Sequence, residues 1–231
     1  MTKILRFTII LIIVFTGNLS AKENKIIMPV NIYVVNMNFG KFQLTYSDEI
    51  KKNIEKDFEY VNNIWSEAGF FWKIKKIKPM KANIKRKEFL EQVDWLEKNY
   101  NSGSVTRPKI LKRIRLLDKI INFKKSYRSR AVNVYYFPEM LVSKKCGTTI
   151  QYSDKFRKNV IVGFKNCNYE KSGIPGRAIA LAHEFGHVFE LKHRGTEGHN
   201  LMIKGGGTII TKAEKILIKR YYNDNYKNYY K

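Results

Sequence analysis

The chain has 231 residues, a length that fits one sizeable domain or one domain with a large insertion. Lys and Arg outnumber Asp and Glu by 44 to 20, and the resulting net charge of +24 favours contact with anionic surfaces or polymers. Because 44% of the residues are hydrophobic and 13% are aromatic, the chain can bury a core, and the composition excludes an intrinsically disordered protein. The same charge is typical of a Lys- and Asn-rich chain from an AT-rich genome, so charge alone selects no partner.

The first residues have the features of a signal peptide. Two basic residues precede an apolar run at 7–16, which is too short to span a bilayer, and Ala21 is a plausible cleavage position. We therefore expect residues 1–21 to be removed on export, and residues 22–231 to form one secreted or periplasmic domain. An uncleaved membrane anchor is the alternative.

The chain has two cysteines, Cys146 and Cys167. An even pair in an exported protein predicts one disulfide, and two buried free thiols are the alternative. Neither cysteine lies in a CxxC motif or near a histidine in the sequence, so neither is expected to be catalytic.

The first elements are predicted to alternate as strand, helix and strand. A β-branched run predicts a strand at 29–37, and apolar residues at helical spacing from Ile50 to Trp65 predict a helix over about 47–68. The alternating run at 70–77 predicts a second strand. This order indicates a sheet that is covered by a helix.

Residues 80–130 interrupt this order with two predicted helices. Phe89 and Leu96 fit the apolar face of one, and Pro108 is placed to begin the other. Residues 73–130 contain 19 Lys and Arg against 5 Asp and Glu. We expect an inserted hairpin that packs its apolar stripe on the domain and leaves its charges in water. A basic amphipathic helix lying on a membrane or a partner is the alternative.

Strand patterns return at 132–137, 148–152 and 160–164. The segment at 148–152 is the most polar of the three, which is typical of an edge strand. The run at 177–191 follows Pro175 and is apolar nearly all round, so it predicts a buried helix.

Three ionisable residues interrupt this apolar helix: His183, Glu184 and His187. Burying polar groups costs free energy unless they are paired or bind a metal. The two histidines are four residues apart, so both imidazoles project from one helical face and can bind the same Zn²⁺ ion, while the adjacent Glu184 can reach a water. This is the HExxH signature of zinc peptidases. His193 follows six residues later and can supply a third imidazole.

From His183 to His193 the sequence reads HEFGHVFELKH, and from His199 to Met202 it reads HNLM. Together these residues resemble the metzincin family of zinc endopeptidases, whose pattern is HExxHxxGxxH followed by a methionine turn. The resemblance implies an α+β, metzincin-like fold: a twisted mixed sheet with a long backing helix, an active-site helix and a C-terminal helix. This chain would add the basic helical insertion. The C-terminal helix would begin at Thr211, where a capping box can form.

The resemblance implies a secreted zinc-dependent endopeptidase with one catalytic Zn²⁺ on His183, His187 and His193. Glu184 would take a proton from the zinc-bound water and pass it to the leaving amine. Met202 would form the methionine turn beneath the metal.

The resemblance also implies where a substrate lies. In the family an extended peptide pairs antiparallel with an edge strand, and the best match here is the strand that contains Gly147, Thr148, Thr149 and Ile150. The pocket after the cleaved bond would be walled by residues 203–208. We therefore expect a protein or peptide substrate, with the basic insertion as a candidate contact for an anionic surface or polymer. No specific nucleic acid is predicted, and a monomer is expected.

One residue departs from the family pattern. Glu190 replaces the glycine whose left-handed backbone turns the chain toward the third ligand. A glutamate in that conformation costs about 1 kcal/mol, which a folded domain can tolerate. The alternative is a helix that continues, so that His193 misses the metal.

The sequence also allows two other metal ligands and one other function. Glu214 is the candidate for a thermolysin-like third ligand, although capping explains it better, and His199 could replace His193. The competing function is a non-catalytic basic module that binds an anionic polymer or a membrane, with its zinc structural or lost. Structural zinc usually has four protein ligands, so His199 would have to be the fourth.

Overall fold

The computed structural model describes residues 25–101, 107–121, 130–140, 146–151, 158–165, 167, 170–171, 173–195 and 198–228. The predicted signal peptide and Tyr152, the last residue of the predicted edge segment, lie outside these ranges. Within them, no helix combines the length and the hydropathy needed to cross a membrane.

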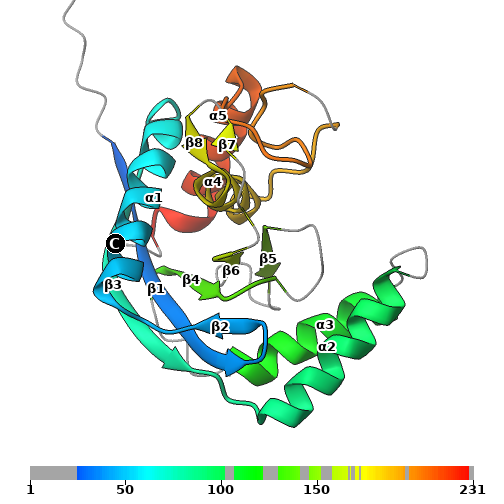
Figure 1. Cartoon of the computed structure of the whole chain (residues 1–231). Coiled ribbons are helices and arrows are strands. Elements are labelled where there is room, and N and C mark those ends of the chain that lie inside the picture. Colours follow the sequence, from blue (N-terminus) through cyan, green and yellow to red (C-terminus); the bar gives the residue numbers. More distant parts are fainter. Residues whose placement is uncertain are drawn as a thin grey trace, which may run out of the picture.

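A twisted mixed sheet forms the middle layer of the fold (Figure 1). Its strands are β1 (Ile26–Phe39), β2 (Phe42–Leu44), β3 (Phe70–Lys81), β4 (Val132–Phe137), β5 (Gly147–Gln151) and β6 (Lys158–Gly163). The order across the sheet is β3, β1, β4, β6 and β5, and β2 folds back antiparallel on the end of β1. Neighbours are parallel except at β5, which runs antiparallel to β6 and forms one edge.

The burial of each strand follows from its place in the sheet. All six residues of β4 are buried, as expected for a central parallel strand that is covered on both faces. The edge strand β5 is less covered, and its residues Gly147 to Thr149 are half-buried. The polar character of this segment therefore predicted its place correctly.

In the described ranges five α-helices flank the sheet: α1 (Asp48–Ser66), α2 (Arg86–Asn101), α3 (Arg107–Ile121), α4 (Gly176–Val188) and α5 (Lys212–Tyr221). A single π-helical turn at Tyr222–Tyr226 follows α5, and a small hairpin, β7 (Glu170–Lys171) and β8 (Ile174–Pro175), precedes α4. The capping box predicted at Thr211 is confirmed, because Thr211 and Glu214 exchange both hydrogen bonds.

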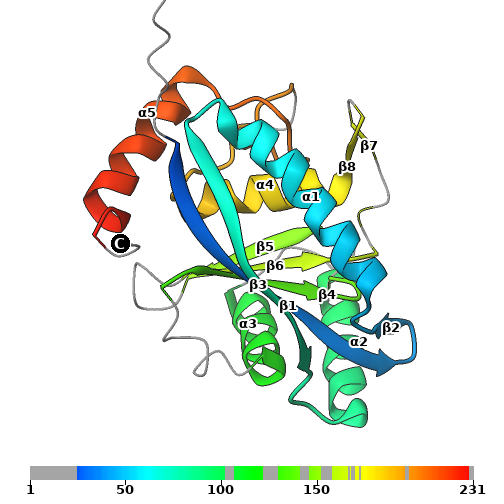
Figure 2. The same ribbon diagram turned by 90° about the vertical axis from the view of Figure 1, so that its left-hand side faces the viewer.

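The helices α1 and α4 lie on one side of the sheet, with α2 and α3 on the other (Figure 2). The core under α1 and α4 is rich in aromatic rings. Phe185 of α4 stacks on Trp72 of β3, with ring centroids 3.7 Å apart, and Phe58 of α1 meets the edge of the same phenylalanine. This packing holds α4 against the sheet and against α1.

The inserted helices α2 and α3 form a second core on the opposite face. The apolar residues of α2 include Phe89, which contacts Phe39 and Phe42 through its ring, and those of α3 include Leu117 and Ile120. These residues are buried against strands β1, β4, β5 and β6. The described apolar stripe of the insertion is therefore covered by the domain, so the interpretation of a membrane-lying amphipathic helix loses its basis.

Two local expectations need correction. The predicted helix at 177–191 ends at Val188, because the chain reverses into a left-handed turn at Glu190. The short elements β2, β7 and β8 were not predicted from sequence, since two- or three-residue strands carry too little periodicity to be recognised.

Candidate metal centre

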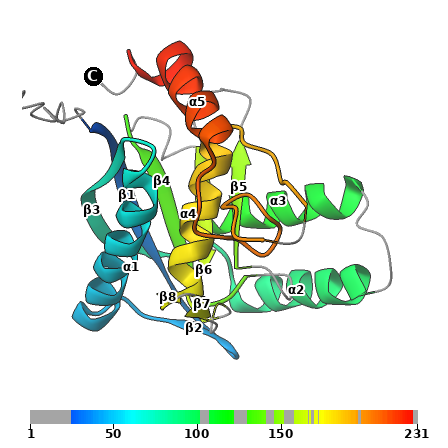
Figure 3. The same cartoon turned by 90° about the horizontal axis from the view of Figure 1, so that it is seen from above.

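The helix α4 lies between α1 and β5 when the fold is seen from above (Figure 3). It is buried along most of its length and carries two of the three predicted ligands. His183 and Glu184 are each only 6% exposed, and His187 is half-buried. Burial lowers the pKa of His183 to about 4, so its imidazole is neutral at neutral pH. A neutral imidazole is the form that binds a metal.

Three imidazole rings converge beside this helix. Nε2 of His193 lies 3.0 Å from Nε2 of His183 and 3.2 Å from Nε2 of His187. Nδ1 of His183 lies 2.7 Å from the carbonyl oxygen of Leu201, and Nδ1 of His187 lies 2.7 Å from that of Leu191. Because a carbonyl oxygen only accepts, both Nδ1 atoms carry the proton and donate it.

This protonation pattern fits a bound cation. In the neutral form with Nδ1 protonated, Nε2 of a helix histidine presents a lone pair, and His193 Nε2 can donate a hydrogen bond to only one of the two. A metal ion among the three nitrogens removes the resulting repulsion. Tetrahedral zinc bonds of 2.0–2.1 Å place two ligand nitrogens about 3.3–3.4 Å apart, close to the two distances here. His183, His187 and His193 thus form a group that could hold a metal.

The chain reaches His193 through a turn at Glu190. Its φ is 60°, the one positive value at a non-glycine position in the described ranges. Leu191 N donates to Gly186 O, and Glu190 N donates to His187 O, which is the Schellman pattern of a helix end. The turn also brings the Leu191 carbonyl onto His187. Glu190 therefore adopts the backbone that the family glycine predicts, and Tyr221 donates a hydrogen bond to its side chain over 2.9 Å.

The segment at 200–202, where the methionine turn was predicted, packs beneath the histidines. Met202 is fully buried, and its backbone N–H donates to Oδ1 of Asn200 over 2.6 Å. A side chain at Gly186 would place its Cβ 2.3 Å from the sulfur of Met202. Gly186 thus lets the turn approach α4 closely enough for the Leu201 carbonyl to meet His183. A glycine inside a helix costs about 1 kcal/mol relative to alanine, and this cost is the sequence signal that could have identified the approach.

The capping residue of α5 also supports this segment. Glu214 is fully buried, and its Oε2 accepts from Nδ2 of Asn200 over 3.0 Å and from Thr211 N over 2.9 Å. Capping therefore occupies Glu214, which does not belong to the histidine group. His199 is exposed and does not belong to it either, so neither alternative ligand is supported.

The edge strand β5 contacts the predicted general base. Thr149 Oγ1 lies 2.7 Å from Oε2 of Glu184 and 2.9 Å from the carbonyl oxygen of the same residue. A Cβ at Gly147 would lie 2.8 Å from Cγ of Glu184. No pattern in the sequence predicts these contacts, because Thr149 and Glu184 are 35 residues apart.

The predicted disulfide is present between Cys146 and Cys167. It connects the residue before β5 to the segment that follows β6. The first residue of β5, Gly147, is next to this bridge and also packs on Glu184, so the disulfide fixes the end of β5 that lies nearest to the predicted base.

No protein-family model and no curated protein matches this chain. Among solved structures it is similar to a chain in a structure described as a chaperone-substrate complex, with 11% sequence identity and a TM-score of 0.46. The match covers 88% of this chain and 36% of that chain, so this chain spans about a third of that protein's length. At this identity and score, the likeness assigns neither a fold family nor a function.

Proposed function

We propose that the chain is a zinc-dependent endopeptidase of the metzincin type. The observation that carries the proposal is the convergence of three imidazole Nε2 atoms, two of them aimed by backbone carbonyls, directly beside a buried glutamate. The left-handed turn at Glu190 and the Asn-Leu-Met segment under the histidines support the same conclusion. The antiparallel edge strand β5 also supports it, because this strand contacts Glu184.

The roles of the chain's own residues follow from this arrangement. A bound zinc ion would supply Lewis-acid chemistry, because it polarises a carbonyl and lowers the pKa of water. His183, His187 and His193 would hold it. Glu184 has a carboxylate that can accept a proton from the attacking water and return it to the leaving amine. The backbone of β5 would pair with an extended peptide.

Residues 203–208, which follow the predicted methionine turn, would form a wall beside the bound peptide. Two of these residues are closely packed. A Cβ at Gly207 would lie 2.1 Å from the carbonyl oxygen of Asn200, and one at Gly206 would lie 2.8 Å from Ile179 Cγ2. These contacts leave no room for a side chain at Gly206 or Gly207.

The deciding experiment combines zinc content with cleavage. The purified protein should retain about one zinc per chain after dialysis, measured by elemental mass spectrometry, and should cleave members of a peptide library. Glu184→Ala should retain the zinc and lose at least about 100-fold in kcat/KM, the usual contribution of a general base. His193→Ala should lose both zinc and cleavage.

The exposed loop histidine provides the matched control. His199→Ala should keep the zinc and the cleavage, because His199 is not part of the histidine group. A folded protein that binds no zinc, or a Glu184→Ala variant with full turnover, would refute the peptidase proposal.

The disulfide indicates an oxidising compartment. Together with the N-terminal sequence, this supports export, and we propose that the enzyme acts outside the cell or in a periplasm.

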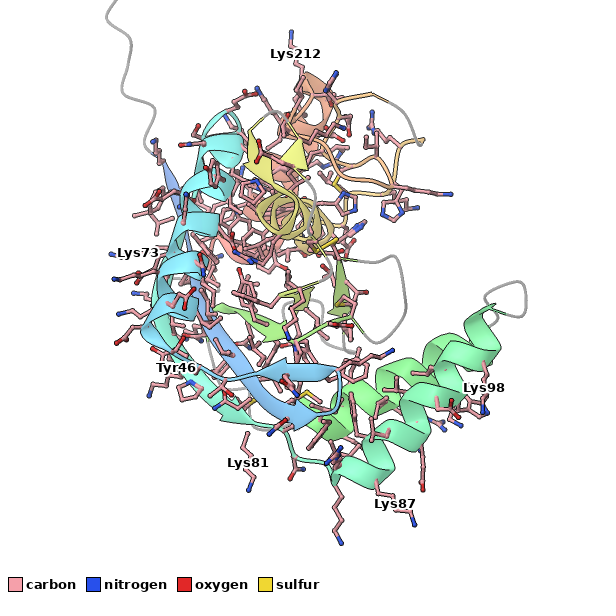
Figure 4. The ribbon with its side chains drawn as sticks, viewed as in Figure 1. Tyr46, Lys73, Lys81, Lys87, Lys98 and Lys212 are labelled. Atoms are coloured by element: carbon pink, nitrogen blue, oxygen red, sulfur yellow. A yellow bond between two sulfur atoms is a disulfide. The ribbon has the colours of Figure 1, made fainter. Side chains whose placement is uncertain are left out.

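A second candidate function, binding of an anionic polymer, is favoured by the charge of β3 and its surroundings. No acidic residue occurs from 68 to 87, whereas eight basic residues do: Lys73, Lys75, Lys76, Lys78, Lys81, Lys85, Arg86 and Lys87. Lys73 and Lys81 point outward from the β3 edge in Figure 4, away from α4. We propose that this edge docks the protein on an acidic polysaccharide.

A salt titration tests this second function. Retention on immobilised heparin should weaken when Lys73, Lys75 and Lys78 are all replaced by Gln. The matched control replaces Lys51, Lys212 and Lys219, which lie on α1 and α5. Equal retention of both triple variants would contradict docking through β3. Strong binding by the zinc-free His193→Ala variant, with no cleavage by the parent, would favour a purely binding module.

A further inference from the structure

Glu184 is held from two sides by the strand that would also receive the substrate. Gly147 and Thr149 lie two residues apart on β5, so they share one face, and that face is turned toward α4. Gly147 leaves no room for a side chain against Cγ of Glu184, while Thr149 contacts the end of its carboxylate. Together the two contacts limit where this carboxylate can point.

The hydroxyl of Thr149 has one hydrogen and two acceptors within reach. One is Oε2 of Glu184 at 2.7 Å, and the other is the Glu184 backbone carbonyl at 2.9 Å. A hydrogen bond to a carboxylate is about twice as strong as one to a neutral acceptor, and here it is also the shorter one. The hydrogen therefore belongs on the carboxylate.

We propose that Thr149 is a positioning residue for Glu184: its hydroxyl donates to Oε2 and holds the carboxylate in one orientation. This inference rests on the proposed function for its kinetic consequence. The hydrogen bond itself does not depend on zinc or on catalysis, so it can be tested separately.

The first test measures thermodynamic coupling in the zinc-free protein. Thr149→Val, Glu184→Ala and the double variant form a cycle, read from urea unfolding. If the hydroxyl bonds the carboxylate, Thr149→Val should lower the folding equilibrium constant about tenfold more in the parent than in the Glu184→Ala background. The same cycle with Thr148→Val should show no coupling, because Thr148 faces the opposite side of β5.

The cycle also separates positioning from a merely structural role. If Thr149 donates to the backbone carbonyl, Thr149→Val should cost the same in both backgrounds, and that result overturns the proposal. Thr149→Ser keeps the hydroxyl and should restore the coupling. If Thr149→Val does not fold, the serine and alanine variants complete the same comparison.

The second test is kinetic. Thr149→Val should lower kcat about 10- to 100-fold with KM nearly unchanged and zinc content unchanged, since a displaced base slows the chemical step without weakening binding. Thr149→Ser should recover most of kcat. A parent that cleaves no peptide defeats the proposed function but leaves the coupling result standing. A cleaving Thr149→Val variant with full kcat overturns the positioning role.

Discussion

Glu190 carries a side chain at a position where the left-handed backbone conformation favours glycine. Its φ of 60° is costly for a side chain with a Cβ, by about 1–2 kcal/mol, yet the turn is needed to bring His193 to the other histidines. The hydrogen bond from Tyr221 offsets part of this cost. Burial raises the pKa of Tyr221, and the hydrogen bond to Glu190 raises that pKa further.

Replacing Glu190 with Gly and with Ala isolates the backbone contribution, because both changes remove the bond to Tyr221. The Gly variant should be about 1 kcal/mol more stable than the Ala variant in urea unfolding, since only Gly adopts this φ without strain. In an ordinary helical position the order is reversed by about the same amount. A more stable Ala variant would therefore show that the turn is not left-handed. Both variants should still bind zinc.

Gly186 offers a second test at the same scale. Gly186→Ala should gain helix propensity but place its Cβ against the buried sulfur of Met202, and overpacking of this kind costs about 1–3 kcal/mol. We expect a net loss of stability and zinc binding that is about tenfold weaker, because the Leu201 carbonyl shifts away from His183. The control is Gly205→Ala, where the added Cβ would meet no atom within 4 Å and no change is expected. Isothermal titration with zinc and urea unfolding measure both effects.

At the scale of elements, the site is assembled where α4 meets β5 and the segment before α5. The helix supplies two histidines and the glutamate, while β5 and the segment at 200–202 hold them through hydrogen bonds. An ion pair between Arg177 of α4 and Asp57 of α1 fixes the other end of α4. Each of these contacts joins segments that are far apart in sequence. The site therefore depends on how α1, α4, β5 and the segment at 200–202 pack together.

The disulfide belongs to this scale, since it anchors the start of β5. Replacing both Cys146 and Cys167 with Ser should lower the free energy of unfolding by about 3 kcal/mol, as expected for a closed loop with a sequence separation of 21 residues. Cleavage should fall more than zinc content, because Gly147 and Thr149 of β5 pack directly on the glutamate. Equal losses of zinc and of cleavage would contradict this division.

At the scale of the whole molecule, zinc binding should stabilise the fold. A ligand that binds only the folded state at 100 times its Kd adds about 2.7 kcal/mol to the free energy of unfolding. Chelation with EDTA should therefore lower the Tm of the parent and of His199→Ala, but leave that of His193→Ala unchanged. A parent whose Tm does not respond to EDTA would show that the three histidines do not hold a metal in solution.

The sequence by itself determined the local parts of this protein. Apolar spacing located the long helices, the Thr211 capping box located the start of α5, and the spacing of His183 and His187 placed two imidazoles on one helical face. These features depend on residues within one or two turns of each other, so local propensity is enough to specify them.

Only the tertiary structure decided how these parts form a site. It brought the Leu201 carbonyl to His183 across 18 residues and Thr149 to Glu184 across 35. It also covered the basic hairpin's apolar stripe with the sheet. Such contacts depend on the sheet order and on close packing at Gly186 and Gly147, and no periodicity in a single sequence encodes which distant segments will meet.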